Sequence, residues 1–355
     1  MRCTTQQRIL QQVQLYPALQ PRDLLKFLHQ STFGCEHLID SPEAAEAYLV
    51  REMATCRPSD SPMLEPLDGN FCRVNLRYLQ ELHISPKTFS KLFALSATES
   101  SGTANDLEPR LHIAMQLAQE GLLPFSPAAL SAEIELWRAQ GYPAVHHSDV
   151  FREHYAPAYR VLAQQHATWL PLLAAIDHLM AEKAPVILAI DGNSATGKTT
   201  LSALLAQVYD CNVFHMDDFF LRGEQRTPER YAQPGENIDH ERFYEQVLLP
   251  LSRGEDVRYE RFDCSSFSLT EPVDAFCKPL NIVEGCYCMH PQLSPLYDYS
   301  VFLQVDADTQ RRRIIQRNGD YAHQFFDRWI PLEESYFTAL DPAGRADMVV
   351  DVRDL

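Results

Sequence analysis

Apolar residues in the first half of the chain recur at helical spacing. Residues 107–120 and 127–140 each place apolar side chains three or four positions apart, and each segment is followed by a glycine, Gly121 or Gly141. A glycine after a periodic segment is typical of a helix end. We therefore expect residues 1–182 to form a mainly α-helical domain.

The pattern changes in the second half, where short apolar runs replace the helical periodicity. These runs are residues 186–190, 212–216, 281–283, 301–305 and 348–350. Each is too short for a buried helix, and helical segments lie between most of them. Strands that alternate with helices predict a parallel sheet covered on both faces. We therefore expect an α/β domain over residues 183–355.

A phosphate-binding motif directly follows the first predicted strand. Residues 192–199 match G-x-x-x-x-G-K-[ST], and a helix-forming segment comes next. In such a loop the glycines let backbone N–H groups converge on phosphate oxygens, a lysine reaches the β- and γ-phosphates, and a hydroxyl can bind Mg²⁺. A chance glycine-rich turn is the alternative, but the strand, spacing, lysine and threonine together disfavour it. The predicted ATP contacts are Gly192, Asn193, Ser194, Ala195, Thr196, Gly197, Lys198, Thr199 and Thr200.

Carboxylates follow two other predicted strands. Asp217 and Asp218 end the second strand, and Glu284 ends the third. Ligands of open α/β folds lie at this edge of the sheet, where an aspartate can accept the proton of an attacking hydroxyl. We expect one of the two aspartates to act as this base, while helix capping is an alternative role for Asp218. Glu284 is expected to face Mg²⁺, with a solvent-exposed strand end as the alternative.

Positive charge is concentrated in residues 311–317. Arg313 and Arg317 are four positions apart and share a helical face, so both are expected to reach one triphosphate as part of a lid. A solvated helix face is the more common role of such a run, but this domain is acidic overall. Residues 183–355 contain 17 Lys and Arg against 28 Asp and Glu.

The order of these motifs resembles the uridine kinase and phosphoribulokinase family of P-loop kinases. The resemblance covers about residues 185–352. It rests on the following segments in order: 190–192 with the loop after it, 216–220, 237–240, 283–285, 305–309 with the arginines, and 346–350.

The resemblance implies a role for several residues. Asp217 would be the catalytic aspartate, and Thr199, Asp217 and Glu284 would form the surroundings of Mg²⁺. Asp239 falls where nucleoside-binding members hold the ribose hydroxyls. Lys198, Arg313 and Arg317 would act on the phosphates, and Arg328 is a further candidate for the lid.

The sequence departs from the family where uridine kinases read the base. Those enzymes have a Tyr-Asp segment with a histidine five residues after the tyrosine, whereas this chain has Phe262 and Phe267. Phenylalanines offer stacking but no hydrogen bond to a pyrimidine. We therefore expect Asp239, Phe262 and Phe267 to bind an acceptor that is recognised mainly through its hydroxyls.

Composition narrows the choice of partners. A formal net charge of −17 argues against a nucleic-acid partner, whose phosphates would be repelled. The apolar runs are too short to cross a bilayer, the first residues are polar, and the cysteines, nine in all, are odd in number. These features predict a cytoplasmic protein with no membrane partner, whose partner is a small hydroxyl-bearing substrate.

The sequence of the first half indicates little about function. A metal site from Glu36, His37, His146 and His147 lacks any typical ligand spacing, so capping and core hydrogen bonds are the favoured interpretation. A second ligand pocket facing the kinase cleft is the alternative. For the whole chain we predict a kinase that uses ATP and Mg²⁺ to phosphorylate a small metabolite. The alternative is an ATP-binding sensor whose P-loop domain switches the helical domain.

Overall fold

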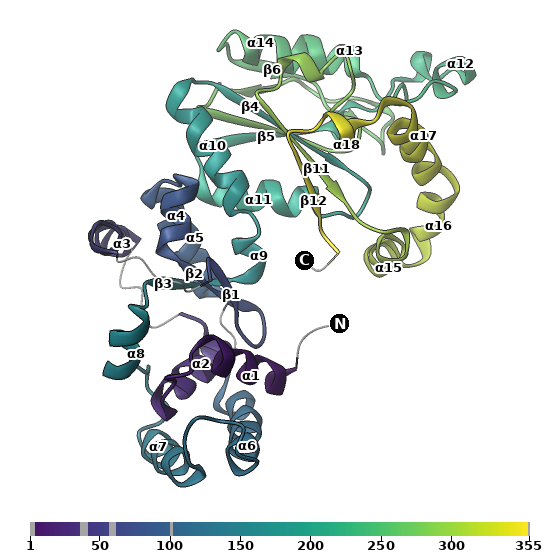
Figure 1. The fold of residues 1–355 in the computed structure, drawn as a ribbon. Coiled ribbons are helices and arrows are strands. Elements are labelled where there is room, and N and C mark those ends of the chain that lie inside the picture. The colour runs from purple at the N-terminus through teal and green to yellow at the C-terminus, as the bar shows by residue number, and fades with distance from the viewer. Residues whose placement is uncertain (1–3, 36–41, 57–61, 100–101, 354–355) are drawn as a thin grey trace. The chain divides into compact units, whose positions relative to one another are not determined.

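The computed structural model describes residues 4–35, 42–56, 62–99 and 102–353. The chain divides into two compact units, Met1–Asp177 and His178–Leu355 (Figure 1). Helix α10 (Leu170–Glu182) crosses this division, and the boundary that we expected from the sequence falls at its end. Among the described residues, no helix combines the length and apolar character needed to span a membrane.

The first unit is mainly helical, as the sequence predicted. Its helices are α1 (Thr5–Leu15), α2 (Pro21–Phe33), α3 (Pro42–Thr55), α4 (Leu76–Leu82), α5 (Pro86–Thr98), α6 (Ala104–Gln119), α7 (Pro127–Ala139), α8 (Asp149–Tyr155) and α9 (Gln164–Ala167). The two helices expected from periodicity correspond to α6 and α7. The Ser126 hydroxyl caps α7 by accepting the N–H of Ala129 at 3.2 Å.

A small antiparallel sheet completes the first unit and was not expected from the sequence. Its order is β1 (Leu64–Pro66), β2 (Phe71–Asn75) and β3 (Tyr159–Ala163). Strand β2 is buried along its whole length although it contains Arg73 and Asn75. A central strand that buries polar side chains lacks the alternation of apolar and polar residues that predicts a strand from sequence.

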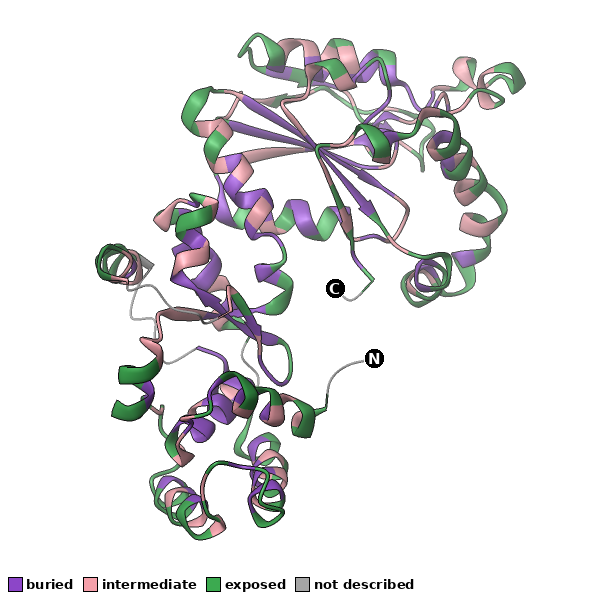
Figure 2. Ribbon diagram, in the orientation of Figure 1, coloured by how far each residue is buried: buried purple, intermediate pink, exposed green. Residues whose placement is uncertain are grey.

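The second unit is built on a five-stranded parallel sheet, which confirms the α/β prediction. The sheet order is β12 (Met348–Asp351), β11 (Tyr299–Gln304), β4 (Val186–Gly192), β10 (Leu280–Glu284) and β5 (Cys211–His215). All five strands coincide with apolar runs expected from the sequence. The central strands are buried, as the purple ribbons show (Figure 2).

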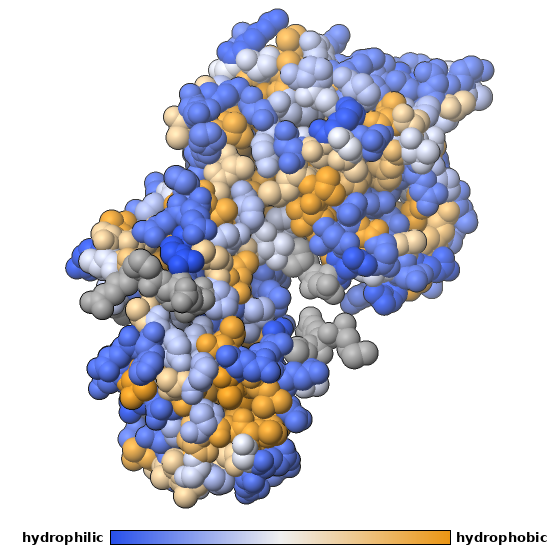
Figure 3. All heavy atoms as spheres, in the orientation of Figure 1, coloured by the Kyte–Doolittle hydropathy of each residue, from blue (hydrophilic) through white to orange (hydrophobic). Residues whose placement is uncertain are grey.

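Helices and two short hairpins surround this sheet (Figure 1). The helices are α11 (Lys198–Val208), α12 (Pro228–Tyr231), α13 (His240–Phe243), α14 (Leu249–Ser252), α15 (Ala307–Asn318), α16 (Ala322–Gln324), α17 (Ile330–Leu340) and α18 (Pro342–Arg345). The hairpins pair β6 (Val257–Tyr259) with β9 (Val273–Ala275), and β7 (Phe262–Asp263) with β8 (Ser268–Leu269). Phe243, Val247 and Leu251 pack on one face of the sheet against Ile187 and Ala189. Polar side chains cover much of the visible surface of this unit (Figure 3).

The strand register brings three strand ends together. Glu284 at the end of β10 lies opposite Ile190 of β4 and opposite His215 of β5. The loop after β4, the turn after β5 and the end of β10 therefore meet at one edge of the sheet. This edge is where ligands of open parallel sheets bind.

Candidate active site

The loop between β4 and α11 requires glycine at its first position. Gly192 has φ +142°, and a Cβ there would lie 2.0 Å from the Leu303 carbonyl oxygen of β11. Gly197 has φ +91° and precedes the first turn of α11. The loop therefore delivers backbone N–H groups and a helix N-terminus to one place, an arrangement that binds phosphate.

The lysine of the motif is held inside its own loop. Lys198 is buried, and its Nζ donates hydrogen bonds to the carbonyl oxygens of Gly192 at 2.8 Å and Asn193 at 3.0 Å. Its charge thus lies among the loop's backbone groups. An incoming phosphate would offer the ammonium group a stronger, charge-assisted hydrogen bond.

Side chains from two other elements meet at the Glu284 carboxylate of β10. The Thr199 hydroxyl donates to Glu284 Oε1 at 3.1 Å, and His215 Nδ1 lies 2.6 Å from the same oxygen. The hydrogen bond to Glu284 raises the pKa of His215, because the carboxylate stabilises the protonated ring. Thr199 and Glu284, both predicted to lie near Mg²⁺, are therefore neighbours in the structure.

The two aspartates after β5 lie in different surroundings. They share a 3₁₀ turn, Met216–Phe219, but Asp218 Oδ2 lies 3.4 Å from Arg261 Nε. Desolvation raises the pKa of Asp217, the nearby Lys198 charge lowers it and the Glu284 charge raises it again. Asp217 therefore interacts electrostatically with the loop lysine and with Glu284, whereas the main charged partner of Asp218 is an arginine.

One of the two predicted lid arginines contacts the phosphate loop. Arg313 on α15 places Nη1 3.5 Å from the Ala195 carbonyl oxygen, and its Nη2 donates to the Val352 carbonyl at 2.7 Å. Arg317 is exposed, and its guanidinium lies over the Phe325 ring at 5.3 Å. Arg328 lies over Trp329 at 4.9 Å.

Glu333 of α17 is an acidic partner of the phosphate loop that we did not predict from the sequence. Its carboxylate is buried and accepts the Ser194 backbone N–H at 3.0 Å as well as the Ser194 hydroxyl. Glu333 lies 139 positions from Ser194 and belongs to no motif. A local pattern could not have revealed it.

The predicted substrate residues fall into two groups. Asp239 is buried and caps α13 by accepting the Arg242 N–H at 3.2 Å. Its Oδ2 also lies 3.3 Å from Arg222 Nε and 3.2 Å from Arg242 Nε. Both oxygens are thus engaged, so an acceptor hydroxyl would have to share them with these arginines.

Phe262 and Phe267 lie close together on the β7–β8 hairpin. Their ring centroids are 5.4 Å apart, and the Arg226 guanidinium lies over both rings, at 5.2 and 4.2 Å. Phe262 is buried, whereas Phe267 is 52% exposed at φ +55°. The hairpin therefore presents an aromatic ring and a cation at the predicted recognition positions.

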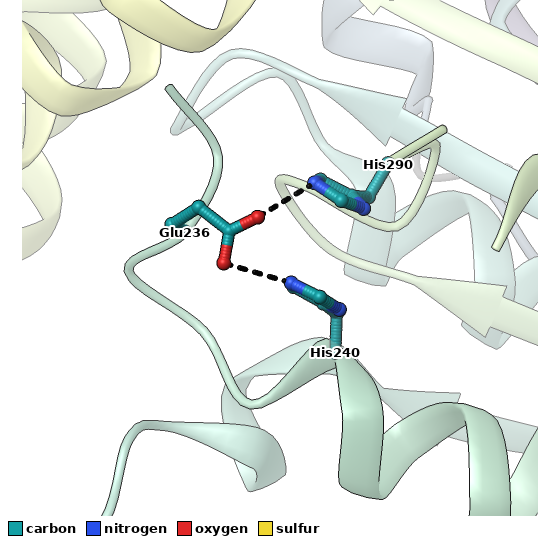
Figure 4. A group of neighbouring side chains, drawn as sticks. All are labelled: Glu236, His240 and His290. Carbon is teal, nitrogen blue, oxygen red and sulfur yellow. Dashed lines mark hydrogen bonds and ion pairs between the residues drawn. The ribbon is translucent and has the colours of Figure 1, made fainter. Parts of the chain in front are cut away.

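A histidine and glutamate cluster contains Glu236 and His240, which flank Asp239 in the sequence, together with the distant His290. The Glu236 carboxylate lies between His240 Nε2 at 2.9 Å and His290 Nε2 at 3.5 Å (Figure 4). The two imidazoles stack with centroids 4.2 Å apart and planes at 13°. Lone pairs in nearly parallel rings do not converge on one metal ion, whereas the Nε2 atom of each ring can bond the carboxylate. Burial, with the nearby His240 charge, lowers the pKa of His290 to about 4. We interpret the cluster as a hydrogen-bonded support for this segment.

Part of the metal site imagined in the first unit, Glu36 and His37, lies outside the described residues. His147 bonds Asp23 Oδ1 through Nδ1 at 2.9 Å and the Tyr159 hydroxyl through Nε2 at 2.7 Å. The His146 carbonyl accepts a hydrogen bond from Arg22. These contacts agree with the hydrogen-bonding interpretation.

Comparisons with known proteins relate about half of the chain to uridine kinases. The chain is 24% identical over 188 residues to a uridine kinase of Latilactobacillus sakei, a match covering 48% of this chain and 86% of that enzyme. It is 27% identical over 186 residues to a uridine kinase of Ligilactobacillus salivarius, with the same coverage. No family model matches the chain.

Two solved structures also match about half of the chain. A possible uridine kinase from Bacillus stearothermophilus has 23% identity and a TM-score of 0.39, covering 51% of this chain and 99% of that one. Phosphoribulokinase from Rhodobacter spheroides has 14% identity and a TM-score of 0.35, covering 47% and 70%.

The parallel sheet, the phosphate loop and the sequence matches together define the second unit as a P-loop kinase fold. In sequence this half resembles uridine kinases, as its motifs indicated. The N-terminal half has no recognised family.

Proposed function

We propose that the protein transfers the γ-phosphate of ATP to a hydroxyl group of a small metabolite. The observation that carries this proposal is the joining of Thr199, Glu284 and His215 at the edge of the sheet, beside Asp217 and the phosphate loop. A loop that only binds nucleotide does not need a carboxylate with a raised pKa next to its lysine. Phosphoryl transfer to an alcohol does use such a group as a base.

The residues at this edge fit Mg²⁺. Thr199, Asp217 and Glu284 offer hydroxyl and carboxylate oxygens, which are the ligands that this hard cation prefers. These three residues would hold the ion, directly or through water. Bound there with ATP, Mg²⁺ would neutralise charge on the phosphates.

Each side chain has a defined part in the proposed reaction. The acceptor oxygen attacks the γ-phosphorus, the bond from that phosphorus to the β–γ bridging oxygen breaks, and ADP leaves. Asp217 takes the proton of the acceptor hydroxyl. Lys198 turns from its carbonyl partners to the β- and γ-phosphates, and Arg313, already at the loop, adds positive charge as the transfer proceeds.

The acceptor is proposed to be a hydroxylated metabolite. Asp239 supplies carboxylate oxygens, and Phe267 with Arg226 supplies a partly exposed stacking surface. The sequence relatives are named uridine kinases, which favours a nucleoside acceptor. The hairpin residues Phe262 and Phe267 disfavour a site that recognises uracil through hydrogen bonds. We therefore infer an acceptor related to nucleosides or polyols.

A metabolite panel tests the proposal. ADP release would be measured with ATP and Mg²⁺ in the presence of nucleosides, polyols and sugars, and compared with the protein's background hydrolysis. We expect at least one hydroxylated compound to raise ADP release, with a matching phosphorylated product detected by mass spectrometry. ATP binding with no acceptor-dependent release over a broad panel would contradict the kinase and favour the sensor.

A further inference from the structure

The N-terminal unit contains a cavity of about 540 Å³ that no part of the proposed kinase reaction uses. Its wall includes Lys26, Gln30, Arg51, His147, Tyr159 and Arg160. These residues come from α2, α3, β3 and the segment before α8, so several elements converge on it. A volume of this size accommodates a small metabolite.

The cavity is electropositive although the protein is acidic. Lys26, Arg51 and Arg160 line it together with one acidic residue, Glu52, which pairs with Arg160 at 2.6 Å. Lys26 donates one hydrogen bond, to the Val145 carbonyl at 2.8 Å, and an ammonium group has three donors. Desolvation, with the charges of Arg73 and Arg152, lowers the pKa of Lys26 to about 8. Arg73 and Arg152 thus lie close enough to repel Lys26, and a bound anion would relieve that repulsion.

A hydrogen-bonded chain of polar side chains forms part of the wall. Asp23 Oδ1 lies 2.9 Å from His147 Nδ1, and His147 Nε2 lies 2.7 Å from the Tyr159 hydroxyl. Burial lowers the pKa of His147 to about 4 and raises that of Tyr159 to about 12, so both groups are neutral near pH 7. The neutral imidazole then donates from Nδ1 to Asp23 and accepts from Tyr159 at Nε2. The Tyr159 oxygen keeps lone pairs that can accept a hydrogen bond from a ligand.

A buried arginine lies behind this wall. Arg73 places its guanidinium carbon 4.8 Å from the centre of the Tyr159 ring, and its Nε donates to Gln30 Oε1 at 2.9 Å. Glu65 pairs with Arg73 at 2.8 Å and offsets its charge. The contacts of Arg73 fix Gln30 and Tyr159, two residues of the cavity wall, in place.

We propose that this cavity binds a small hydroxylated organic anion, held by Lys26 and the neighbouring arginines and read by Tyr159 through a ligand hydroxyl. A phosphate and a carboxylate share the chemistry that the cations recognise. Among such anions, the Tyr159 oxygen favours ligands with a hydroxyl group that donates a hydrogen bond to it. All residues that line the cavity belong to the first unit, and none of them belongs to the proposed kinase site.

Calorimetric titration of the full chain tests this site. The probes are ribose 5-phosphate, gluconate, methyl phosphate and neutral ribose. The protein variants are Lys26→Gln, Tyr159→Phe and Lys198→Ala, with Lys87→Gln as a matched control, because Lys87 is an exposed lysine of α5. Lys198→Ala separates binding in this cavity from phosphate binding at the kinase loop.

We expect ribose 5-phosphate or gluconate to bind and neutral ribose not to bind. Comparing the affinities for ribose 5-phosphate and gluconate shows whether the site binds a phosphate or a carboxylate. Lys26→Gln should weaken binding by about tenfold or more, as expected for loss of a charge-assisted hydrogen bond, while Lys87→Gln and Lys198→Ala should not change it. Tyr159→Phe should reduce the preference for the hydroxylated anion over methyl phosphate.

A pH series on the unaltered protein keeps the proposal testable even if Lys26→Gln misfolds. Asp23, His147, Arg73 and Arg152 lie around Lys26. Among these five groups, Lys26 is the one expected to titrate between about pH 7 and pH 9. Affinity should therefore fall over that range as Lys26 loses its proton. The proposal is overturned if neither anion binds, if Lys198→Ala alone abolishes binding, or if affinity is constant across that range.

Discussion

Glu333 and Ser194 form a contact that places an internal carboxylate against the phosphate loop. The Ser194 backbone N–H donates to Glu333 Oε2 at 3.0 Å, and the Ser194 hydroxyl donates to Oε1. Burial raises the pKa of Glu333, and the Lys198 charge opposes this rise. The loop proposed to bind the ATP phosphates through its N–H groups thus has one of these groups already bonded to a protein carboxylate.

Replacement of Glu333 by Gln should tighten ATP binding. The amide keeps an oxygen for the Ser194 N–H but removes a negative charge that repels phosphate. We expect the KM for ATP to fall by about 3- to 10-fold, because the raised pKa of Glu333 and the opposite charge of Lys198 offset part of the repulsion. Steady-state kinetics would measure it, with Glu334→Gln on the same helix as the control. A KM that rises would mean that Glu333 mainly holds the loop in shape.

Lys198→Ala should abolish phosphoryl transfer. Its ammonium group lies within the loop, poised to move to the β- and γ-phosphates, and the substitution leaves the loop without that point charge. Product formation would be followed with the best acceptor from the panel, and circular dichroism would confirm folding. Undiminished transfer would place the active site elsewhere.

Asp217→Asn should lower kcat by about 10²–10⁴-fold, the usual contribution of a positioned general base. ATP affinity should change much less, because the loop holds the phosphates. Asp218→Asn is the matched comparison, since Asp218 is adjacent but pairs with Arg261. If Asp218→Asn proved the damaging change and Asp217→Asn had no effect, the base would be assigned to the wrong residue.

The acid limb of the pH profile of kcat/KM, which reports the enzyme before Mg²⁺ and ATP bind, should lie above the ordinary aspartate pKa of 3.8. The pKa of Asp217 is raised in the folded protein, so the base is protonated and activity is lost as the pH falls through that raised value. The Asp218 charge contributes to the rise. Asp218→Asn should therefore move the limb to lower pH, and an unmoved limb would assign it to another group.

Uridine and cytidine should be poor acceptors. Phe262 and Phe267 offer no hydrogen bond to a pyrimidine edge, and Arg226 lies over both rings. The check is kcat/KM for both nucleosides against the remaining panel. A uridine value of about 10⁵ M⁻¹s⁻¹, within the range of a cognate substrate, would contradict this expectation.

The sequence predicted the second unit well because its signals are local. Five apolar runs became the five strands of one parallel sheet, and the loop motif carries its own spacing. Glu284 and Thr199 were both expected near Mg²⁺, and the strand register makes them neighbours. Such a contact follows from topology once the strands are known to be parallel.

The contacts that the sequence did not predict join residues far apart in the chain. Glu333 reaches Ser194, and the Asp23–His147–Tyr159 chain joins α2 to β3. Neither set of contacts joins residues at a fixed spacing in the sequence. Strand β2 was missed for a related reason, because it buries Arg73 where a strand pattern predicts an apolar side chain.

The hydrogen bond from Arg313 to the Val352 carbonyl bears on how the protein should be handled. It ties the arginine that contacts the phosphate loop to the residues just after the edge strand β12. Proteolytic trimming back past residue 352, or an affinity tag fused close to it, would disturb the anchor of α15. A preparation trimmed there would lose the proposed phosphoryl transfer and, because Val352 is itself buried, would also melt at a lower temperature. An inactive sample should therefore be checked by intact mass before the full chain is judged inactive.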